Sequence, residues 1–370
     1  MGSGETTELT IIFSNLSSST QYLGLVAKIS SMRITHVVYI GDKNSRFVKH
    51  LLEIQSIWKL TIIPLDKGKY PISLLIHLKE LFRLYVLLKT YPTKQILASG
   101  QVASLMSCFA SLGKKRRFDV VRHHGDEYVH DRDMKNVFFD KVICSISSNI
   151  ICVSKTQAQF LISQGVNSNK IHVIYNSCPD LRNLKPREFR NSEQAQKILV
   201  ISRQIPYKGV EIAVEGFARF LQLGGVGTLT LCGEIGESSE QVYTSLSSLP
   251  VSSFTIIDKW QTDMHKLYRE HDTLIHVPTR PFAEAFGLVY IESLAFGLYG
   301  VFTSSGVIRD LGDKVTGATI VPFQDASAVA EALLLKSTQN LDRLEFQNYL
   351  RDRFSQDRFE EEYMNFLSFT

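Results

Sequence analysis

Apolar and polar positions follow two alternating patterns along the chain. Short runs rich in β-branched residues alternate with longer stretches in which apolar residues recur at helical spacing. Such alternation is typical of parallel sheets covered by helices. The short runs predict strands at residues 10–13, 35–40, 60–64, 95–98, 120–122, 150–153 and 172–174, and then at 197–201, 228–232, 254–257, 273–276, 300–302 and 318–321.

A polar stretch separates the two series of strands. Residues 176–196 carry Pro179 and Pro186, which favours an interdomain linker. A chain of 370 residues that is 44% hydrophobic is long enough for two cores. We therefore predict an α/β fold of two doubly wound, Rossmann-like domains, residues 1–180 and 181–350. We expect them to face each other across a cleft, with ligands near the carboxyl ends of the strands.

The composition favours a cytoplasmic protein. The five cysteines are odd in number and lack metal-ligand spacing, so reduced thiols are expected rather than disulfides. The N-terminus lacks the basic and apolar regions of a secretory signal, and no apolar run is long enough to cross a bilayer. Residues 2–6 fit the loose pattern for N-myristoylation, although so short a motif often matches by chance.

The charge is unevenly distributed along the chain. Residues 1–180 hold 22 Lys/Arg against 13 Asp/Glu, whereas the rest hold 19 against 24, so the halves are +9 and −5. The asymmetry suggests an anionic partner for the first half, and the candidates are a membrane surface, a lipid-linked phosphate and nucleic acid. Residues 74–89 interleave leucines with basic residues, which favours a core-packed helix with a solvated basic face; a helix lying on a membrane is the alternative.

Residues 281–297 carry two carboxylates around the start of an apolar helix. Pro281 and Gly287 indicate a loop that gives way to a helix, and Gly297 stands where a helix usually stops. Glu284 is then at the helix entrance and Glu292 lies inside it. Eight helical steps return two side chains to within roughly 80° of each other, so both carboxylates are expected to face one ligand.

A second motif follows the first strand of the second domain. Arg203 and Lys208 emerge after residues 197–201, and Lys208 is followed by Gly209 and an apolar helical stretch. A diphosphate needs fixed positive charge from more than one direction, which an Arg fork and a Lys point charge supply without a metal. Two solvated surface cations are the alternative, but the carboxylate pair 76 residues downstream of Lys208 favours a ligand site.

Together these motifs resemble the retaining glycosyltransferases of family 4, which have the GT-B fold and use sugar nucleotides without a metal. The resemblance extends over nearly the whole chain, and residues 351–370 look like the C-terminal helix that packs back on the first domain. It implies that Arg203 and Lys208 bind the donor diphosphate, that Glu292 holds the ribose and that Glu284 contacts the transferred sugar. The other donor-binding residues it implies are Gly233, Ala285, Phe286, Gly287 and Leu288.

A histidine pair follows the strand at 120–122. The resemblance assigns a cleft histidine to this place, with His124 as the catalytic residue and His123 as the alternative and an acceptor contact. Ser18 and Ser19, in the loop after the first strand, are the other expected acceptor contacts. The neighbouring Asp131-Arg132-Asp133 formally matches a metal-binding Asp-x-Asp, but its place in a loop or helix start favours solvated or capping side chains over a metal site.

The expected activity is transfer of a hexosyl group from a nucleoside-diphosphate sugar to a hydroxyl of a glycan, a polysaccharide precursor or a lipid-linked acceptor. Retention of configuration and independence of metal and cofactor are implied by the resemblance. The alternatives are a non-catalytic GT-B-like partner subunit and a sugar-nucleotide epimerase. No recognisable nucleic-acid module accompanies the basic residues. Departures from the family pattern, such as Ser202 where Gly is frequent, leave the donor sugar undetermined.

Overall fold

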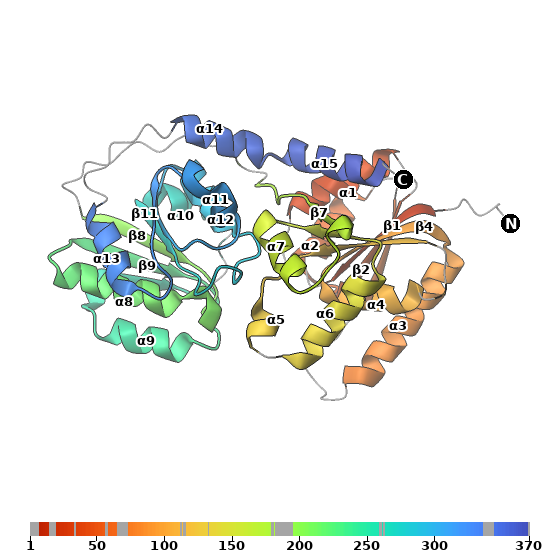
Figure 1. Ribbon diagram of the computed structural model, residues 1–370, viewed down its shortest axis with the longest axis horizontal. Helices are drawn as coiled ribbons and strands as arrows, with labels where there is room; N and C mark the ends of the chain where they lie inside the picture. The colour runs from red at the N-terminus through yellow and green to blue at the C-terminus, as the bar shows by residue number, and fades with distance from the viewer. Residues whose placement is uncertain are drawn as a thin grey trace. The chain divides into compact units, whose positions relative to one another are not determined.

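The computed structural model describes residues 7–14, 20–32, 35–55, 58–64, 73–111, 113, 116–131, 133–178, 181, 195–258, 261, 263–335 and 344–368 (Figure 1). It divides into two compact units. The first comprises Met1–His124, Tyr128–Ser177 and Gln356–Thr370, and the second comprises Gly125–Glu127 and Cys178–Ser355. The myristoylation pattern at residues 2–6, the acceptor contacts Ser18 and Ser19, and most of the predicted linker lie outside the described residues.

The first unit contains a parallel sheet of seven strands in the order β3-β2-β1-β4-β5-β6-β7. The strand order runs in one direction from β1 to β3 and in the other from β4 to β7, so this is a doubly wound sheet. Its switch point lies between the neighbouring strands β1 and β4. The strands are β1 Thr7–Ser14, β2 Thr35–Gly41, β3 Lys59–Pro64, β4 Thr93–Ser99, β5 Arg117–Arg122, β6 Asn149–Cys152 and β7 Ile171–Val173.

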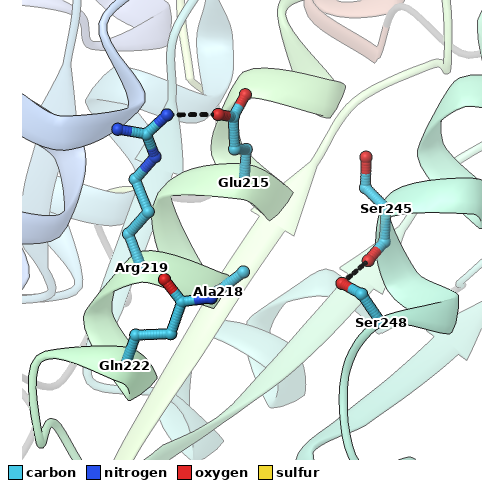
Figure 2. Close-up of a pocket in the computed structure, with 6 residues that line it drawn as sticks. All are labelled: Glu215, Ala218, Arg219, Gln222, Ser245 and Ser248. Atoms are coloured by element: carbon cyan, nitrogen blue, oxygen red, sulfur yellow. Dashed lines mark hydrogen bonds and ion pairs between the residues drawn. The ribbon is translucent and has the colours of Figure 1, made fainter.

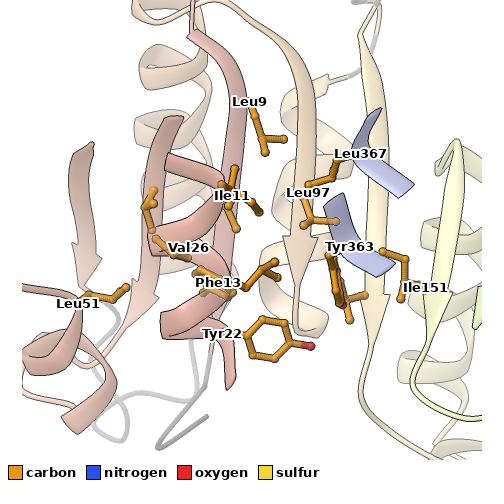
Figure 3. Close-up of a cluster of buried hydrophobic side chains, with 14 of the residues drawn as sticks. Leu9, Ile11, Phe13, Tyr22, Val26, Leu51, Leu97, Ile151, Tyr363 and Leu367 are labelled. Carbon is orange, nitrogen blue, oxygen red and sulfur yellow. The ribbon is translucent and has the colours of Figure 1, made fainter. Parts of the chain in front are cut away.

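Helices cover both faces of this sheet. Apolar side chains of α1, α2 and α15 pack on one face with Leu9, Ile11 and Phe13 of β1, and Figure 3 shows Tyr363 and Leu367 of the C-terminal helix in that cluster. Side chains of α3, α4 and α6 pack on the other face. The helices of this unit are α1 Thr20–Met32, α2 Arg46–Ile54, α3 Ser73–Thr90, α4 Gln101–Ser111, α5 Glu127–His130, α6 Met134–Ile146, α7 Lys155–Ser163 and α15 Gln356–Ser368.

The second unit contains a parallel sheet of six strands in the order β10-β9-β8-β11-β12-β13. Its core is formed largely by these strands with α8 and α13. The strands are β8 Gln196–Ile201, β9 Gly227–Cys232, β10 Phe254–Ile257, β11 Thr273–His276, β12 Tyr299–Phe302 and β13 Ala318–Ile320. The helices are α8 Val210–Gln222, α9 Ser239–Ser247, α10 Met264–Glu270, α11 Leu288–Ala295, α12 Val307–Leu311, α13 Ala326–Leu335 and α14 Leu344–Arg353.

These two Rossmann-like units confirm the predicted α/β fold class, and every predicted strand overlaps an observed one. The chain crosses between the units after His124, Glu127, Ser177 and Ser355. Cys108, Cys144, Cys152, Cys178 and Cys232 are buried, and none of them is in a disulfide. None of the described helices combines the length and apolar character that spanning a bilayer requires.

The surface of α3 differs from the predicted core-packed helix with a solvated basic face. Leu84 and Leu88 are buried against the sheet, as that interpretation requires. The outer side, however, carries apolar as well as basic residues: Phe82 is 66% exposed and Val86 43% exposed. The prediction was therefore incomplete, because a hydrophobic pattern that extends around a helix does not reveal which of its apolar residues face the core.

Candidate active site

The carboxyl ends of β8 and β11 bring two distant segments together. The strands pair in parallel, Thr273 opposite Ile198 and Ile275 opposite Val200, so the residues that follow each strand leave the sheet at the same edge. After β8 the chain makes a short 3-10 turn, Pro206–Lys208, and Gly209 follows in the left-handed region with φ +64°. A Cβ on Gly209 would lie 2.1 Å from the carbonyl oxygen of Val277, so glycine permits both the conformation and the close approach.

Lys208 and Glu284 form a largely buried ion pair at this edge. Lys208 Nζ lies 2.6 Å from Glu284 Oε2, and the two side chains are 14% and 12% exposed. His276, the last residue of β11, brings Nε2 to 3.0 Å from the same oxygen. Burial alone would raise the pKa of Glu284, but the charge of Lys208 and the hydrogen bond with His276 lower it to about 2. Glu284 is therefore ionised at neutral pH.

The backbone around Glu284 is an anchored loop, and this corrects the predicted relation between the two glutamates. Helix α11 begins at Leu288 with Gly287 as its N-cap, so Glu284 lies four residues before the helix. The angle of roughly 80° applies only within a continuous helix and is wrong for this pair. The loop is held by a hydrogen bond of 3.1 Å from the Glu284 amide to Ser305 Oγ.

The end of α11 matches the predicted stop. Gly297 has φ +84°, its amide donates to the Leu294 carbonyl at 3.0 Å, and the Leu298 amide donates to the Ser293 carbonyl at 2.9 Å. These two bonds are the Schellman arrangement that ends many helices. The predicted binding residue Leu288 is 37% exposed, while the side chains of Ala285 and Phe286 are buried. The side chains of Ala285 and Phe286 therefore belong to the core and are not exposed to a ligand.

Glu292 lies inside α11 and has a tyrosine partner. Tyr268 of α10 is fully buried and donates its hydroxyl hydrogen to Glu292 Oε2 over 2.6 Å. Burial and the nearby Glu292 charge raise the pKa of Tyr268 well above its ordinary value, so the phenol stays protonated and remains a donor. The Tyr268 ring stacks on Phe296, with centroids 5.1 Å apart. Packing and hydrogen bonding together thus restrict the Glu292 carboxylate.

The other predicted residues of the second unit lie near the ends of β8 and β9. Arg203 is exposed and forms no ion pair with any residue that the structure describes. Gly233 follows β9, and a Cβ there would lie 1.8 Å from the Ser202 carbonyl oxygen. The absence of a side chain at Gly233 therefore lets the backbones after the two strands approach closely. Arg203 is the residue after Ser202 and therefore lies next to this close approach.

The two predicted histidines belong to the first unit and have different partners. His123 Nε2 lies 2.8 Å from Ser99 Oγ at the end of β4, and burial lowers the pKa of His123 to about 4. His124 Nε2 lies 3.3 Å from Asp140 Oδ1 of α6. Burial alone would raise the pKa of Asp140, yet the hydrogen bond from His124 and the charge of Arg122 hold it below its ordinary value. Asp140 thus presents a carboxylate to His124.

The acidic residues near the histidines serve local structure. Asp133 is the N-cap of α6, where its side chain accepts a hydrogen bond of 3.1 Å from the Asn136 amide. Hydrogen bonds from Asn136 lower the pKa of Asp133. Within the part of the chain that the structure describes, no three His, Cys, Asp or Glu side chains are close enough together to hold a metal ion.

A surface hollow of about 390 Å³ lies elsewhere on the second unit. Figure 2 shows its lining on α8 and α9, with Arg219 Nη2 2.6 Å from Glu215 Oε1 and Ser248 Oγ bonded to the Ser245 carbonyl. Arg219 also donates to Ser327 Oγ of α13, so these side chains already have protein partners. None of the predicted site residues lines the hollow. The charged groups that could act on a ligand lie instead at the edge formed by β8 and β11.

The sequence interpretation missed three residues that contact the predicted ones. His276 lay inside a predicted buried strand, Tyr268 in a helix read only for its family likeness, and Asp140 in a stretch with no motif. A signal existed for His276 alone, because a histidine at the carboxyl end of a parallel strand lies where ligands bind in doubly wound folds. Tyr268 and Asp140 lie far along the sequence from Glu292 and His124, the residues they contact, and no regular spacing links them.

Solved structures match nearly the whole chain. HepE of Anabaena in complex with UDP and glucose superposes with a TM-score of 0.78 at 17% identity, over 98% of this chain and 100% of that one. A sucrose-phosphate synthase from Thermosynechococcus elongatus gives a TM-score of 0.76 at 15% identity, with the same coverage. At these identities the likeness concerns the fold. Two Rossmann-like units in this arrangement of strands define the GT-B class.

The sequence is similar to known glycosyltransferases. Residues 182–353 match the model described as Glycosyl transferases group 1. A 41.2 kDa protein of the cps region of Klebsiella pneumoniae is 22% identical over 309 residues, which cover 80% of this chain and 78% of that protein. The sucrose-phosphate synthase of Spinacia oleracea is 28% identical over 162 residues, or 40% of this chain and 15% of that protein. Residues 182–353 are thus similar to the group 1 glycosyltransferases, and the comparisons together support an enzyme of glycosyl transfer.

Proposed function

We propose that the enzyme moves a hexosyl group from a nucleoside-diphosphate sugar to an acceptor hydroxyl, with retention at the anomeric carbon and without a metal. The observation that carries the proposal is the buried Lys208–Glu284 pair at the β8–β11 edge; the exposed Arg203 leaves the same strand, β8. In this pair a carboxylate, which suits sugar hydroxyls, lies next to a cation, which suits a diphosphate. In support, solved structures of HepE, which shares the fold, hold UDP and UDP-glucose.

Each charged group then has a distinct role. Arg203 and Lys208 neutralise the charge that develops on the leaving diphosphate, which is the largest contribution expected of such a site. A lysine has three N–H donors, so Lys208 can keep its bond to Glu284 while it donates to a phosphate oxygen. Glu284 binds the transferred sugar. Glu292, held by Tyr268, accepts hydrogen bonds from the ribose hydroxyls.

In the first unit we propose His124 as the residue that orients the reacting groups. Its imidazole lies 3.3 Å from Asp140 Oδ1, and a carboxylate partner both fixes the ring and favours its protonated form. His123 is the less suitable candidate, because Ser99 engages its Nε2 and its low pKa keeps the ring neutral. Asp140→Asn keeps the size of the side chain and should lower the pKa that His124 shows in NMR titration.

The donor is tested with a panel of sugar nucleotides, each assayed for nucleoside-diphosphate release with and without lipid-linked and glycan acceptors. We expect release from at least one donor, stimulated by an acceptor. Arg203→Ala should reduce it about 100-fold. The matched control is Arg219→Ala, an exposed arginine of the same unit at the hollow of Figure 2, which should behave as wild type.

Other outcomes of the panel would support the alternatives. Binding of a nucleotide without release would indicate a partner subunit, and conversion of the donor to its epimer without acceptor would indicate an epimerase. The epimerase alternative is included because a putative UDP-N-acetylglucosamine 2-epimerase from Listeria monocytogenes shares the fold, with a TM-score of 0.66 at 11% identity. Full activity of Arg203→Ala would contradict the assigned diphosphate site.

We further propose that α3 contacts an anionic membrane surface, where a lipid-linked acceptor would be located. Residues 73–117 contain eight Lys/Arg and one Asp/Glu, Glu80, which is buried and bound to Arg83. On α3 the exposed Phe82 and Val86 alternate along the sequence with the exposed cations Lys79, Arg83 and Lys89. Apolar side chains combined with basic ones on one helix surface are the pattern that binds anionic bilayers.

Sedimentation with phosphatidylserine-containing vesicles tests this contact. We expect binding to these vesicles, weaker binding to phosphatidylcholine vesicles, and a loss of binding for Phe82→Ser/Val86→Ser. Leu52→Ser is the matched control, because Leu52 is 52% exposed on α2, whose buried residues pack on the opposite face of the sheet. Equal binding to both lipids, or unchanged binding of the α3 variant, would refute the proposal.

A further inference from the structure

His276 is a buried histidine with a defined place beside the sugar-binding carboxylate. It is 4% exposed at the carboxyl end of β11, and its ring packs edge-on against Tyr290 with centroids 4.7 Å apart. Tyr290 is itself fully buried, so the imidazole has little freedom to turn. Its Nε2 lies 3.0 Å from Glu284 Oε2. Position and orientation of the ring are thus fixed toward one oxygen of Glu284.

The direction of the hydrogen bond follows from the two protonation states. Burial lowers the pKa of His276, although the negative Glu284 partly offsets this, so the imidazole is neutral at neutral pH. Glu284 is ionised and can only accept hydrogen bonds. The hydrogen on the ring is therefore on Nε2, and His276 donates to Glu284. This bond does not depend on a charge on the imidazole.

The two oxygens of Glu284 are used unequally. Oε2 receives both Lys208 Nζ, at 2.6 Å, and His276 Nε2, at 3.0 Å. Among the residues that the structure describes, Oε1 has no hydrogen-bond partner. The hydrogen bond from the Glu284 amide to Ser305 Oγ holds the backbone but does not set the rotation of the carboxylate. The two donors on Oε2 determine how the carboxylate is turned.

We infer that His276 is a positioning residue, which holds Oε2 of Glu284 so that Oε1 accepts a hydrogen bond from a hydroxyl of the donor sugar. The inference rests on the proposed function and adds to it the residue that orients the carboxylate. Lys208 divides its N–H groups and its charge between Glu284 and the diphosphate, so it does not serve Glu284 exclusively. His276 is neutral and donates only to Glu284, so it keeps the orientation of the carboxylate while Lys208 also donates to the phosphate.

The test compares three histidine variants with the donor that gives the fastest release in the panel, beginning with UDP-glucose. His276→Leu fills the space without a donor, and His276→Gln offers an amide N–H close to the position of Nε2. His271→Gln is the matched control, because His271 is buried in the same unit but its ring bonds the Leu267 carbonyl and Thr230. Binding of the free nucleoside diphosphate is measured by calorimetry for each variant.

We expect kcat/KM of His276→Leu to fall about 30-fold, as for loss of a hydrogen bond to a charged group. His276→Gln should recover most of the activity, and His271→Gln should match wild type. Nucleoside-diphosphate affinity should stay the same in all variants, because that ligand lacks the sugar. A parallel loss of its affinity, or equal defects in His276→Leu and His276→Gln, would mean a merely structural role and overturn the inference. Lack of release by the wild type would instead overturn the proposed function.

Discussion

The buried Lys208–Glu284 pair should make a large, pH-dependent contribution to the stability of the second unit. The pKa of Glu284 falls from 4.5 to about 2 in the folded protein, which corresponds to about 3 kcal/mol in favour of the ionised folded form. Both side chains are less than 15% exposed, so solvent screens the pair little. Lys208→Met keeps most of the aliphatic stem and removes the charge, leaving a carboxylate with only His276 as a partner.

We expect Lys208→Met to lower the free energy of unfolding by about 3 kcal/mol at pH 7. In the wild type this contribution is fully present above pH 4.5, the ordinary pKa of the unfolded chain, and is lost as the pH falls toward 2. The difference between the two proteins should therefore shrink over the same range. Lys208→Met/Glu284→Gln removes both charges and should recover much of the loss at pH 7, which gives the pair energy in a double-mutant cycle.

Urea unfolding between pH 3 and 8 measures these differences, and hydrogen exchange of β8 and β11 assigns them to the second unit. The exposed Arg219–Glu215 pair on α8, with side chains 44% and 52% exposed, provides the control. Arg219→Met should cost no more than about 0.5 kcal/mol. The reasoning is refuted if Lys208→Met costs no more than Arg219→Met, or if its cost is the same at pH 3 and pH 7.

Three further substitutions test separate parts of the site. Arg203→Ala should leave the free energy of unfolding within about 0.5 kcal/mol of wild type, since the side chain is exposed; a larger loss in urea unfolding would indicate a structural role. Tyr268→Phe should raise KM for the donor about tenfold with little change in kcat, because Glu292 loses a partner and not a reacting group; an unchanged KM in steady-state kinetics would contradict this. Gly209→Ala should cost more than about 2 kcal/mol in thermal unfolding, because the added Cβ meets the Val277 carbonyl; a wild-type Tm would exclude the steric argument.

Buried parallel strands were predictable because they are short, β-branched and bounded by polar or glycine residues. The predictions at 254–257 and 273–276 coincide with β10 and β11. The prediction at 10–13 began too late, because β1 starts at Thr7, which pairs with Thr93 of β4. A polar residue that extends a strand through backbone hydrogen bonds leaves no mark in an apolar pattern. Strand existence thus follows from composition, and strand ends follow from pairing.

The candidate site was only partly predictable for a similar reason. Chemistry indicated that Lys208 and Glu284 belong to one site, and the structure brings their charged atoms to 2.6 Å across 76 residues of sequence. The geometry given for Glu284 and Glu292 was wrong, because residue spacing determines an angle only where the helix is continuous. The helix begins at Leu288, four residues after Glu284, and the sequence showed Gly287 but not the residue at which helical geometry begins.

The partners of the predicted residues show where the limit lies. A charged residue can be recognised in a sequence because its charge matches a particular ligand. His276 and Tyr268 instead contact protein carboxylates, so they match no ligand-binding motif. Both are almost fully buried, and burial is what gives them their function: it keeps the imidazole neutral and the phenol protonated, so that each can only donate to its glutamate. An exposed histidine or tyrosine at the same sequence position would exchange its hydrogen bond with water. The groups that orient the site are therefore determined by the core of the second unit, and a change in core packing around Tyr290 or Phe296 should alter catalysis without touching a ligand-binding residue.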